Sequence, residues 1–271
     1  MSFREGKEIP LKTVYVEKEA QIVGMADIHS GDKFFRQDLF ESYVDWIKAD
    51  SNRFAMILGD AYNFYSHWFV PSGMWDQIWT PNEQIRYMER TLYPIRKQIL
   101  GMVKGNHEIK GLTARTSIDP LGNLCEDWGV EDLGPGGYFC LNVSSETGNY
   151  IYKIVPTHTL GGSRRKAYKA IQMVEQVGFD DADIVMLGHQ HTMIQLPFTR
   201  TRCYWNDTSK RFEYRFHRID AIRCGTMLEY PDYAVYKGLP AMQLGFPIIS
   251  LDGSSSSRGV RVDIGENNLR D

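Results

Sequence analysis

The sequence predicts an α/β fold in which helices cover a β-sheet and a strand-rich second half completes the sheet region. Three observations support this. Short apolar runs alternate with helix-patterned segments in the first half, which is the β-α-β order of a covered sheet. The second half holds mostly alternating, strand-like segments. Five of the apolar runs end in Asp, His or Asn. The chain has 271 residues, 42 % hydrophobic and 24 % charged, and we expect one domain over residues 1–271.

The elements of the first half follow from apolar spacing. Residues 21–26 (QIVGMA) and 54–58 (FAMIL) are short apolar runs typical of buried strands. Residues 34–48 carry apolar side chains at helical spacing, and residues 82–100 are mostly helical, with Pro94 ending or kinking that helix early. Residues 98–103 lead into a third strand.

The second half is predicted to be richer in strands. Residues 138–143 and 150–155 alternate, and residues 183–187 form another apolar run. A helix is expected over residues 163–177, with Ser163 as its N-cap. Residues 202–205 and 212–216 flank a polar turn at 206–209 and predict a hairpin. Strands at 246–251 and 259–264 close the sheet region.

Charge and cysteine content exclude several classes. The 31 Lys and Arg against 34 Asp and Glu give a net charge of −3, so no strong basic field indicates nucleic acid. The sequence contains no run of 18 apolar residues, so no membrane span is predicted. The first residues also lack the apolar region of a secretory signal. The four cysteines form no C-x-x-C pair, which favours free thiols. We therefore expect a cytoplasmic protein.

The chemistry lies at the carboxyl ends of five apolar runs, which is where open α/β sheets place their sites. The seven candidate ligands are two Asp, one Asn and four His that follow or lie close behind these runs: Asp27, His29, Asp60, Asn106, His158, His189 and His191. A mixed oxygen and nitrogen set suits Mn²⁺, Fe or Zn²⁺. Seven ligands are too many for one ion, whereas two ions about 3.5–4 Å apart that share a carboxylate use all seven and can clamp a phosphoryl group. The alternative is a set of ordinary polar residues at strand ends.

Local spacing supports this prediction. Gly59, Gly105 and Gly188 each precede a candidate ligand at a strand end, where the chain is expected to turn sharply. Asp27 and His29 are two residues apart, so an extended segment would point both side chains to one side. The pair His189 and His191 repeats that spacing.

The motifs Asp27-x-His29, Gly59-Asp60, Gly105-Asn106-His107-Glu108, His158 and Gly188-His189-x-His191 resemble those of the calcineurin-like metallophosphoesterase superfamily. The whole layout is more loosely similar to metallophosphoesterases encoded by phages and prophages. The resemblance implies a four-layer α/β/β/α sandwich of two mixed sheets flanked by helices, with the motifs over residues 27–191 and the second sheet completed by residues 192–264. It also implies that Asp27, His29 and His191 hold one ion, that Asn106, His158 and His189 hold the other, and that Asp60 bridges them. His107 would contact the phosphate and protonate the leaving oxygen.

Two departures narrow the activity. Protein Ser/Thr phosphatases of this superfamily carry Asp-Arg-Gly after the Gly-Asp motif, whereas here Asp60 is followed by Ala-Tyr-Asn-Phe. The resemblance therefore argues against a protein phosphatase. The position three residues after Asp60, often Asp in the family, is Asn63.

Three further residues are candidates for substrate binding: Asn63, His67 and Arg164. His67 lies in an aromatic stretch, residues 62–69, that could line the substrate pocket and stack on a base, or could pack on the segment around Trp75 and Trp79. Arg164 lies in a basic segment near the start of the predicted helix. This segment could bind phosphate, or it could lie on a solvated face of the helix.

The predicted function is a binuclear metal-dependent phosphoesterase, with a phosphodiester of a nucleic acid or nucleotide as substrate. The predicted cofactors are two divalent ions, Mn²⁺ first, with Zn²⁺, Fe or Ni²⁺ as alternatives. Two other functions stay open: a phosphomonoesterase acting on a small metabolite, and a metal-binding scaffold without turnover. If phage-encoded, the protein would act in the host cytoplasm.

Overall fold

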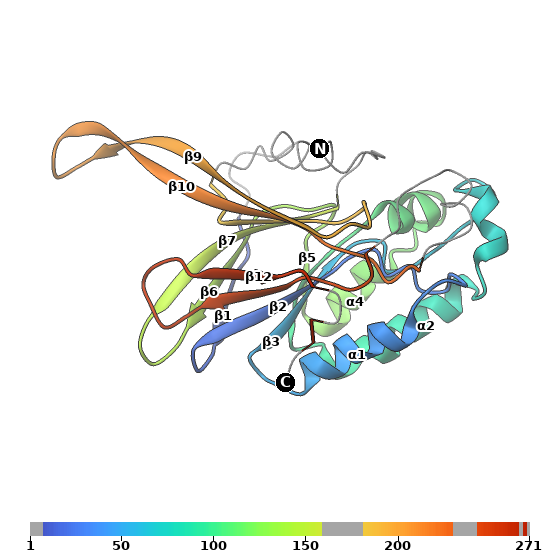
Figure 1. Ribbon diagram of the computed structural model, residues 1–271. Coiled ribbons are helices and arrows are strands. Elements are labelled where there is room, and N and C mark those ends of the chain that lie inside the picture. The colour runs from blue at the N-terminus through green and yellow to red at the C-terminus, as the bar shows by residue number, and fades with distance from the viewer. Residues whose placement is uncertain (1–7, 159–180, 230–242, 266–267, 270–271) are drawn as a thin grey trace.

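Two six-stranded mixed sheets form the centre of the molecule (Figure 1). The computed structural model describes residues 8–158, 181–229, 243–265 and 268–269. The first sheet has the order β1-β6-β7-β8-β10-β9, and the second has the order β12-β11-β2-β3-β4-β5. The α/β class expected from the sequence is therefore confirmed.

The second sheet holds three neighbouring parallel strands, which are β2 (Glu19–Met25), β3 (Arg53–Leu58) and β4 (Ile99–Val103). The short β5 (Glu131–Asp132) extends the parallel part beyond β4. On the other side, β11 (Ile248–Asp252) and β12 (Val260–Asp263) add two antiparallel strands. The predicted strands at 21–26, 54–58 and 98–103 are thus confirmed, within a few residues at their ends.

The first sheet begins at its edge with β1 (Leu11–Tyr15), which pairs in parallel with β6 (Phe139–Ser144). Next come β7 (Asn149–Thr157) and β8 (Ile184–Leu187), which are parallel to each other. The long hairpin of β9 (Ile194–Asn206) and β10 (Arg211–Arg223) completes this sheet, and Figure 1 shows it extending past the neighbouring strands. The hairpin predicted at 202–205 and 212–216 exists, but each strand is 13 residues long.

The space between the sheets is filled by apolar side chains of alternate strand residues. Ile22, Met56 and Leu100 of the second sheet meet Leu141 and Ile154 of the first, and all five are fully buried. Strand residues alternate between the two faces of a sheet, so the neighbours of these residues point the other way, toward the helices.

Helices cover the outer face of the second sheet. They are α1 (Gln37–Lys48), α2 (Pro81–Leu92) and α4 (Pro120–Trp128). Val23 and Ile57 of that sheet pack in the same cluster as Phe40 of α1, Met88 of α2 and Leu124 of α4. The described residues therefore form a helix layer on two stacked sheets. The helix expected over 163–177 lies outside the described residues.

Local signals explain where α2 begins and ends. Thr80 accepts a hydrogen bond from the backbone N–H of Glu83, whose carboxylate accepts one from the N–H of Thr80 in return, so the two form a capping box. The helix ends at Leu92, and a short 3₁₀ turn at Tyr93–Ile95 contains Pro94. The early end predicted from Pro94 is confirmed. In the described part of the chain, no helix combines the length and apolar character needed to cross a membrane.

Candidate metal centre

The carboxyl ends of five strands meet where the two sheets face each other. Asp27 and His29 follow β2, Asp60 follows β3, and Asn106 follows β4. From the other sheet, His158 follows β7 directly, and the loop after β8 carries His189 and His191. Backbone hydrogen bonds tie neighbouring loops together, among them Asp27 N to Gly59 O at 3.0 Å and His29 N to Asp60 O at 2.9 Å. The predicted candidate ligands therefore lie at one place, and two sheets contribute to it.

One cluster holds Asp27, His29 and His191. The Nε2 of His191 lies 3.3 Å from Oδ1 of Asp27 and 3.2 Å from Nε2 of His29. The Nε2 of His29 lies 3.9 Å from the same Asp27 oxygen. This oxygen is buried and accepts no hydrogen bond, although Asp27 is fully enclosed. A buried carboxylate oxygen in that position needs a partner, and a cation between the three donors would provide it.

A second cluster holds Asp60, His158 and His189. The Nε2 of His158 lies 3.2 Å from Oδ2 of Asp60 and 3.1 Å from Oδ1 of Asn106. Asp60 also forms a group with His29 and His107, so its carboxylate reaches toward both clusters. The structure thus brings together all seven residues that the sequence proposed as ligands.

The donor spacing fits a small divalent ion. Donors about 2.1 Å from one ion, at angles between octahedral and tetrahedral, lie about 3.0–3.4 Å from each other. Distances of 3.1, 3.2 and 3.3 Å within the two clusters match that range, whereas the 3.9 Å between Nε2 of His29 and Oδ1 of Asp27 is longer. These His and Asp groups could hold a metal ion, and the absence of any thiolate among them excludes a soft-metal site.

The loops that carry the candidate ligands contain a left-handed backbone conformation, which residues other than glycine rarely adopt. Five candidate ligands have a left-handed φ: Asp27 (51°), His29 (52°), Asp60 (50°), His189 (81°) and His191 (49°). Each such residue costs about 1–2 kcal/mol, so their concentration at one place is typical of a functional site. The extended segment expected for Asp27 and His29 is therefore wrong. β2 ends at Met25, and tight turns aim both side chains at the centre.

Two of the glycines show why the loops approach so closely. Gly59 has a φ of +82°, as the predicted sharp turn requires. Gly105 has no such φ. A Cβ there would lie only 2.1 Å from Oδ1 of Asp60. Glycine is therefore required at this position because no side chain fits beside the carboxylate, and not because the backbone turns.

Electrostatics differ between the histidines. Nδ1 of His158 lies 2.8 Å from the carbonyl oxygen of Leu58 and donates to it, which turns Nε2 toward Asp60. Burial lowers the pKa of His158, but the Asp60 carboxylate raises it by more, to about 10. Burial, followed by the charge of His158, lowers the pKa of His189 to about 4. Burial likewise lowers the pKa of His29. His189 and His29 are thus neutral, with a lone pair free to bind a cation.

His107 forms a third group with His29 and Asp60, which share their side chains with the two clusters. Its Nδ1 donates to the carbonyl oxygen of Asn63 at 2.5 Å, and its Nε2 lies 3.8 Å from Oδ2 of Asp60. Its ring contacts the rings of His29, Tyr65 and Phe69, with centroids 4.6, 5.3 and 5.0 Å away. One nitrogen is therefore anchored and the other faces the centre, which is the arrangement a proton donor needs.

Glu108 is a residue whose role sequence reasoning missed, although it lies in the Gly-Asn-His-Glu motif. Its buried carboxylate accepts hydrogen bonds from four backbone N–H groups, those of Asp60 (3.0 Å), Ala61 (2.7 Å), Tyr62 (3.2 Å) and Gly105 (2.8 Å). It joins the loop after β3 to the loop after β4 and so positions Asp60. Burial, followed by the charge of Asp60, raises the pKa of Glu108 to about 7.

The three substrate-binding candidates lie in different surroundings. Asn63 is fully buried, and its side-chain amide donates to Asp32 at 3.3 Å, so it meets His107 only through its backbone carbonyl. His67 is exposed. Arg164 lies outside the described residues. Substrate binding by any of them stays a prediction.

The aromatic stretch at 62–69 divides between the candidate metal centre and the helix-side core. The expected packing on Trp75 is wrong, since that side chain is 90 % exposed. Tyr65 and Phe69 pack against His107, as a site wall would. Tyr62 and Phe64 stack on each other within the helix-side core, at a centroid distance of 4.6 Å. Trp68 is 52 % exposed, so its ring is open to a ligand.

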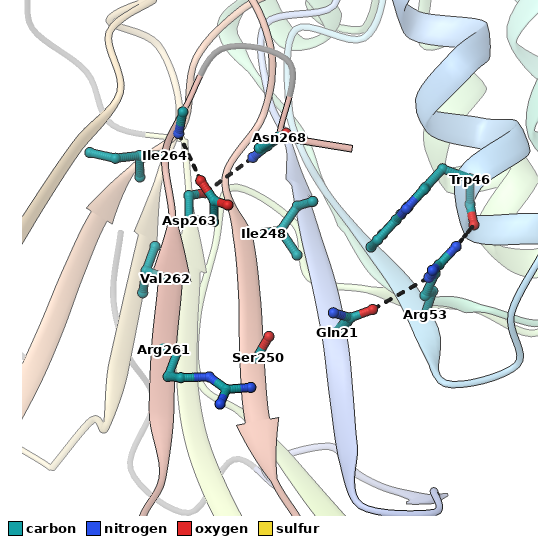
Figure 2. A pocket seen from close by; sticks show the side chains of 11 residues that line it. Gln21, Trp46, Arg53, Ile248, Ser250, Arg261, Val262, Asp263, Ile264 and Asn268 are labelled. Carbon is teal, nitrogen blue, oxygen red and sulfur yellow. Dashed lines mark hydrogen bonds between the residues drawn. The ribbon is translucent and has the colours of Figure 1, made fainter. Parts of the chain in front are cut away.

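A separate cavity of about 640 Å³ lies beside β11 and β12. Figure 2 shows Arg53 at its edge, donating to Gln21 and to the carbonyl oxygen of Trp46. None of the seven candidate ligands lines this cavity. It is therefore distinct from the metal centre.

Comparisons with known proteins leave the family open. No family model matches the sequence, and no curated protein matches it. Among solved structures, the solution NMR structure of the Thermotoga maritima protein TM1076 is similar over 89 % of this chain and 98 % of that one, with 10 % identity and a TM-score of 0.31. A similarity this low carries no argument about fold or activity.

Proposed function

We propose that the protein is a binuclear metal-dependent phosphodiesterase. The observation that carries the proposal is the position of Asp60. Its Oδ2 lies 3.2 Å from His158 of the second cluster, and the same carboxylate groups with His29 of the first. A carboxylate between two donor sets is what a site for two ions requires.

In this proposal, Asp27, His29 and His191 would hold one ion, Asn106, His158 and His189 would hold the other, and Asp60 would bind both. Mn²⁺ is the proposed ion, with Zn²⁺, Fe and Ni²⁺ as alternatives. Two such ions would supply positive charge that stabilises the phosphoryl transition state and acidifies the attacking water.

His107 is proposed as the general acid. The Asn63 carbonyl holds one proton on Nδ1, so in the imidazolium form the second proton lies on Nε2, faces the centre and could move to the departing oxygen, which leaves the neutral ring. The rings of Tyr65 and Phe69 beside it limit access of water to that proton. The leaving group of an alkyl phosphodiester departs as an alkoxide, so its departure is faster when an acid is positioned to protonate it.

Hydrolysis of two chromogenic esters tests the proposal. Purified protein supplied with Mn²⁺ should hydrolyse bis-p-nitrophenyl phosphate faster than p-nitrophenyl phosphate. The reverse preference would indicate a phosphomonoesterase. Hydrolysis of neither ester by a protein that binds Mn²⁺ would indicate a scaffold.

A further inference from the structure

The β9–β10 hairpin carries a row of exposed aromatic rings that packs on no other part of the described chain. Phe212, Tyr214 and Phe216 are spaced two residues apart on β10, so they share one face of the hairpin. Their exposed fractions are 72 %, 69 % and 71 %. Trp205 of β9 is paired with Phe212, shares that face, and is 47 % exposed. Four adjacent exposed rings on one ribbon mark a binding surface.

The same hairpin is positively charged in a negatively charged protein. Residues 199–218 contain six Arg or Lys and two Asp or Glu, a net charge of +4, whereas the whole chain carries −3. The remainder of the chain therefore carries −7. Arg215 lies on the opposite face of the ribbon from the three rings, with its guanidinium 5.4 Å from the ring of Tyr204. The charge of this segment is complementary to a polyanion, and it opposes close packing against a second copy of itself.

The hairpin also starts and ends at the candidate metal centre. β9 begins three residues after His191, and Arg223 at the end of β10 is paired with Ile194 at the start of β9. Thirteen residues of extended strand span about 40 Å, so the ribbon leads from the centre to its tip over that length. Figure 1 shows the ribbon extending free of the neighbouring strands.

We propose that this ribbon binds single-stranded nucleic acid and thereby holds the substrate of the metal centre. Unpaired bases would stack on the four rings, and basic side chains such as Arg218, which shares the ring face of β10, would contact the phosphates, which is how sequence-tolerant single-strand binding works. A duplex hides its base faces and would bind more weakly. The proposal rests on the phosphodiesterase function for the use of the bound strand, but the binding itself needs neither metal nor turnover.

Fluorescence anisotropy with a labelled 20-nucleotide oligothymidylate, in EDTA, measures binding without cleavage. The wild-type protein should bind it more tightly than a 20-base-pair duplex. The triple variant Phe212→Ala, Tyr214→Ala, Phe216→Ala should bind at least about a hundredfold more weakly, because it removes three of the four stacking rings. Arg218→Gln, two residues beyond Phe216 on the same face as the rings, should reduce the slope of log affinity against log salt by about 0.7. The matched control is Tyr15→Ala. This residue is 81 % exposed on β1, at the opposite edge of the same sheet, and its loss should change nothing.

Equal affinity of the wild type and the triple variant, or no binding by the wild type at low salt, would overturn the proposal. So would sedimentation that shows a wild-type dimer and a monomeric triple variant of unchanged oligonucleotide affinity, which would assign the rings to self-association. If the triple variant misfolds by circular dichroism, Phe212→Ala alone at the tip gives the same test.

Hydrolysis of bis-p-nitrophenyl phosphate separates the two proposals. Hydrolysis of this ester without oligonucleotide binding would support the phosphodiesterase function and contradict binding by the ribbon. Oligonucleotide binding without hydrolysis would support binding by the ribbon and contradict the phosphodiesterase function.

Discussion

The Nε2 of His158 lies 3.2 Å from Oδ2 of Asp60, and this contact joins the two sheets at the candidate metal centre. His158 follows β7 of the first sheet and Asp60 follows β3 of the second. The site therefore depends on how the sheets stack, and each sheet alone supplies only part of the donor set.

Replacing Asp60 tests whether one carboxylate serves two ions. Asp60→Asn should lose both ions, because it removes the only charge that the two donor sets share. Elemental analysis of the purified variant after Mn²⁺ loading measures this. Asp45→Asn, on the exposed face of α1, is the matched control and should retain the metal content of the wild type. Two ions per chain in Asp60→Asn would exclude the bridging role.

Replacing His107 tests the proton donor. His107→Ala should keep its metal but lower kcat by about 10²–10⁴, since that is the usual contribution of a general acid. The loss should be largest for diesters with poor leaving groups, which need protonation most. Steady-state kinetics with p-nitrophenol and alkyl leaving groups gives the comparison. If both leaving groups suffer the same loss, His107 has another role.

Replacing Glu108 tests the link between the two strand-end loops. Glu108→Ala leaves four backbone N–H groups without their acceptor, and each buried unsatisfied donor costs about 1–3 kcal/mol. The free energy of unfolding of the metal-free protein, from urea denaturation, should fall by about 3 kcal/mol or more. The control Glu126→Ala, exposed on α4, should change it by less than about 0.5 kcal/mol. A similar small change in Glu108→Ala would refute the positioning role.

Thiol labelling tests the described surroundings of the cysteines, none of which forms a disulfide. Burial raises the pKa of the Cys125 thiol to about 12, so it stays protonated and unreactive as the pH rises from 7 to 9. Cys203 is exposed on the hairpin and should react first with a disulfide reagent. Cys203→Ser should abolish the fast phase. A fast phase that persists in this variant would contradict the burial of Cys125 or Cys224.

Much of the fold could be predicted because buried strands and helix ends have recognisable local sequence patterns. β3 and β4 are continuous apolar runs, and Pro94 cannot stand in a helix interior without breaking its hydrogen bonds. The short edge strand β5 could not be predicted, since its two residues are exposed and owe their conformation to pairing with β4. The hairpin was predicted too short for a similar reason. The inner residues of β10 are strand because they pair with β8, which is distant in sequence.

The site divides in the same way. Its ligand types could be predicted, because Asp and His at strand ends are visible in the sequence. The left-handed backbone at Asp27 and His191 could not, because Asp and His adopt it only in a small minority of positions and tertiary contacts decide which. The role of Glu108 was equally hidden, since its four partners lie in two loops that only the folded sheet brings together.

A metal titration of activity tests the central claim most directly. Protein treated with EDTA and dialysed is supplied with increasing equivalents of Mn²⁺, and the initial rate of bis-p-nitrophenyl phosphate hydrolysis is recorded at each step. If Asp60 joins two donor sets into one centre, the rate should rise until two equivalents per chain and then level off. A rate that saturates at one equivalent, or no hydrolysis at any level of Mn²⁺, would contradict a binuclear phosphodiesterase.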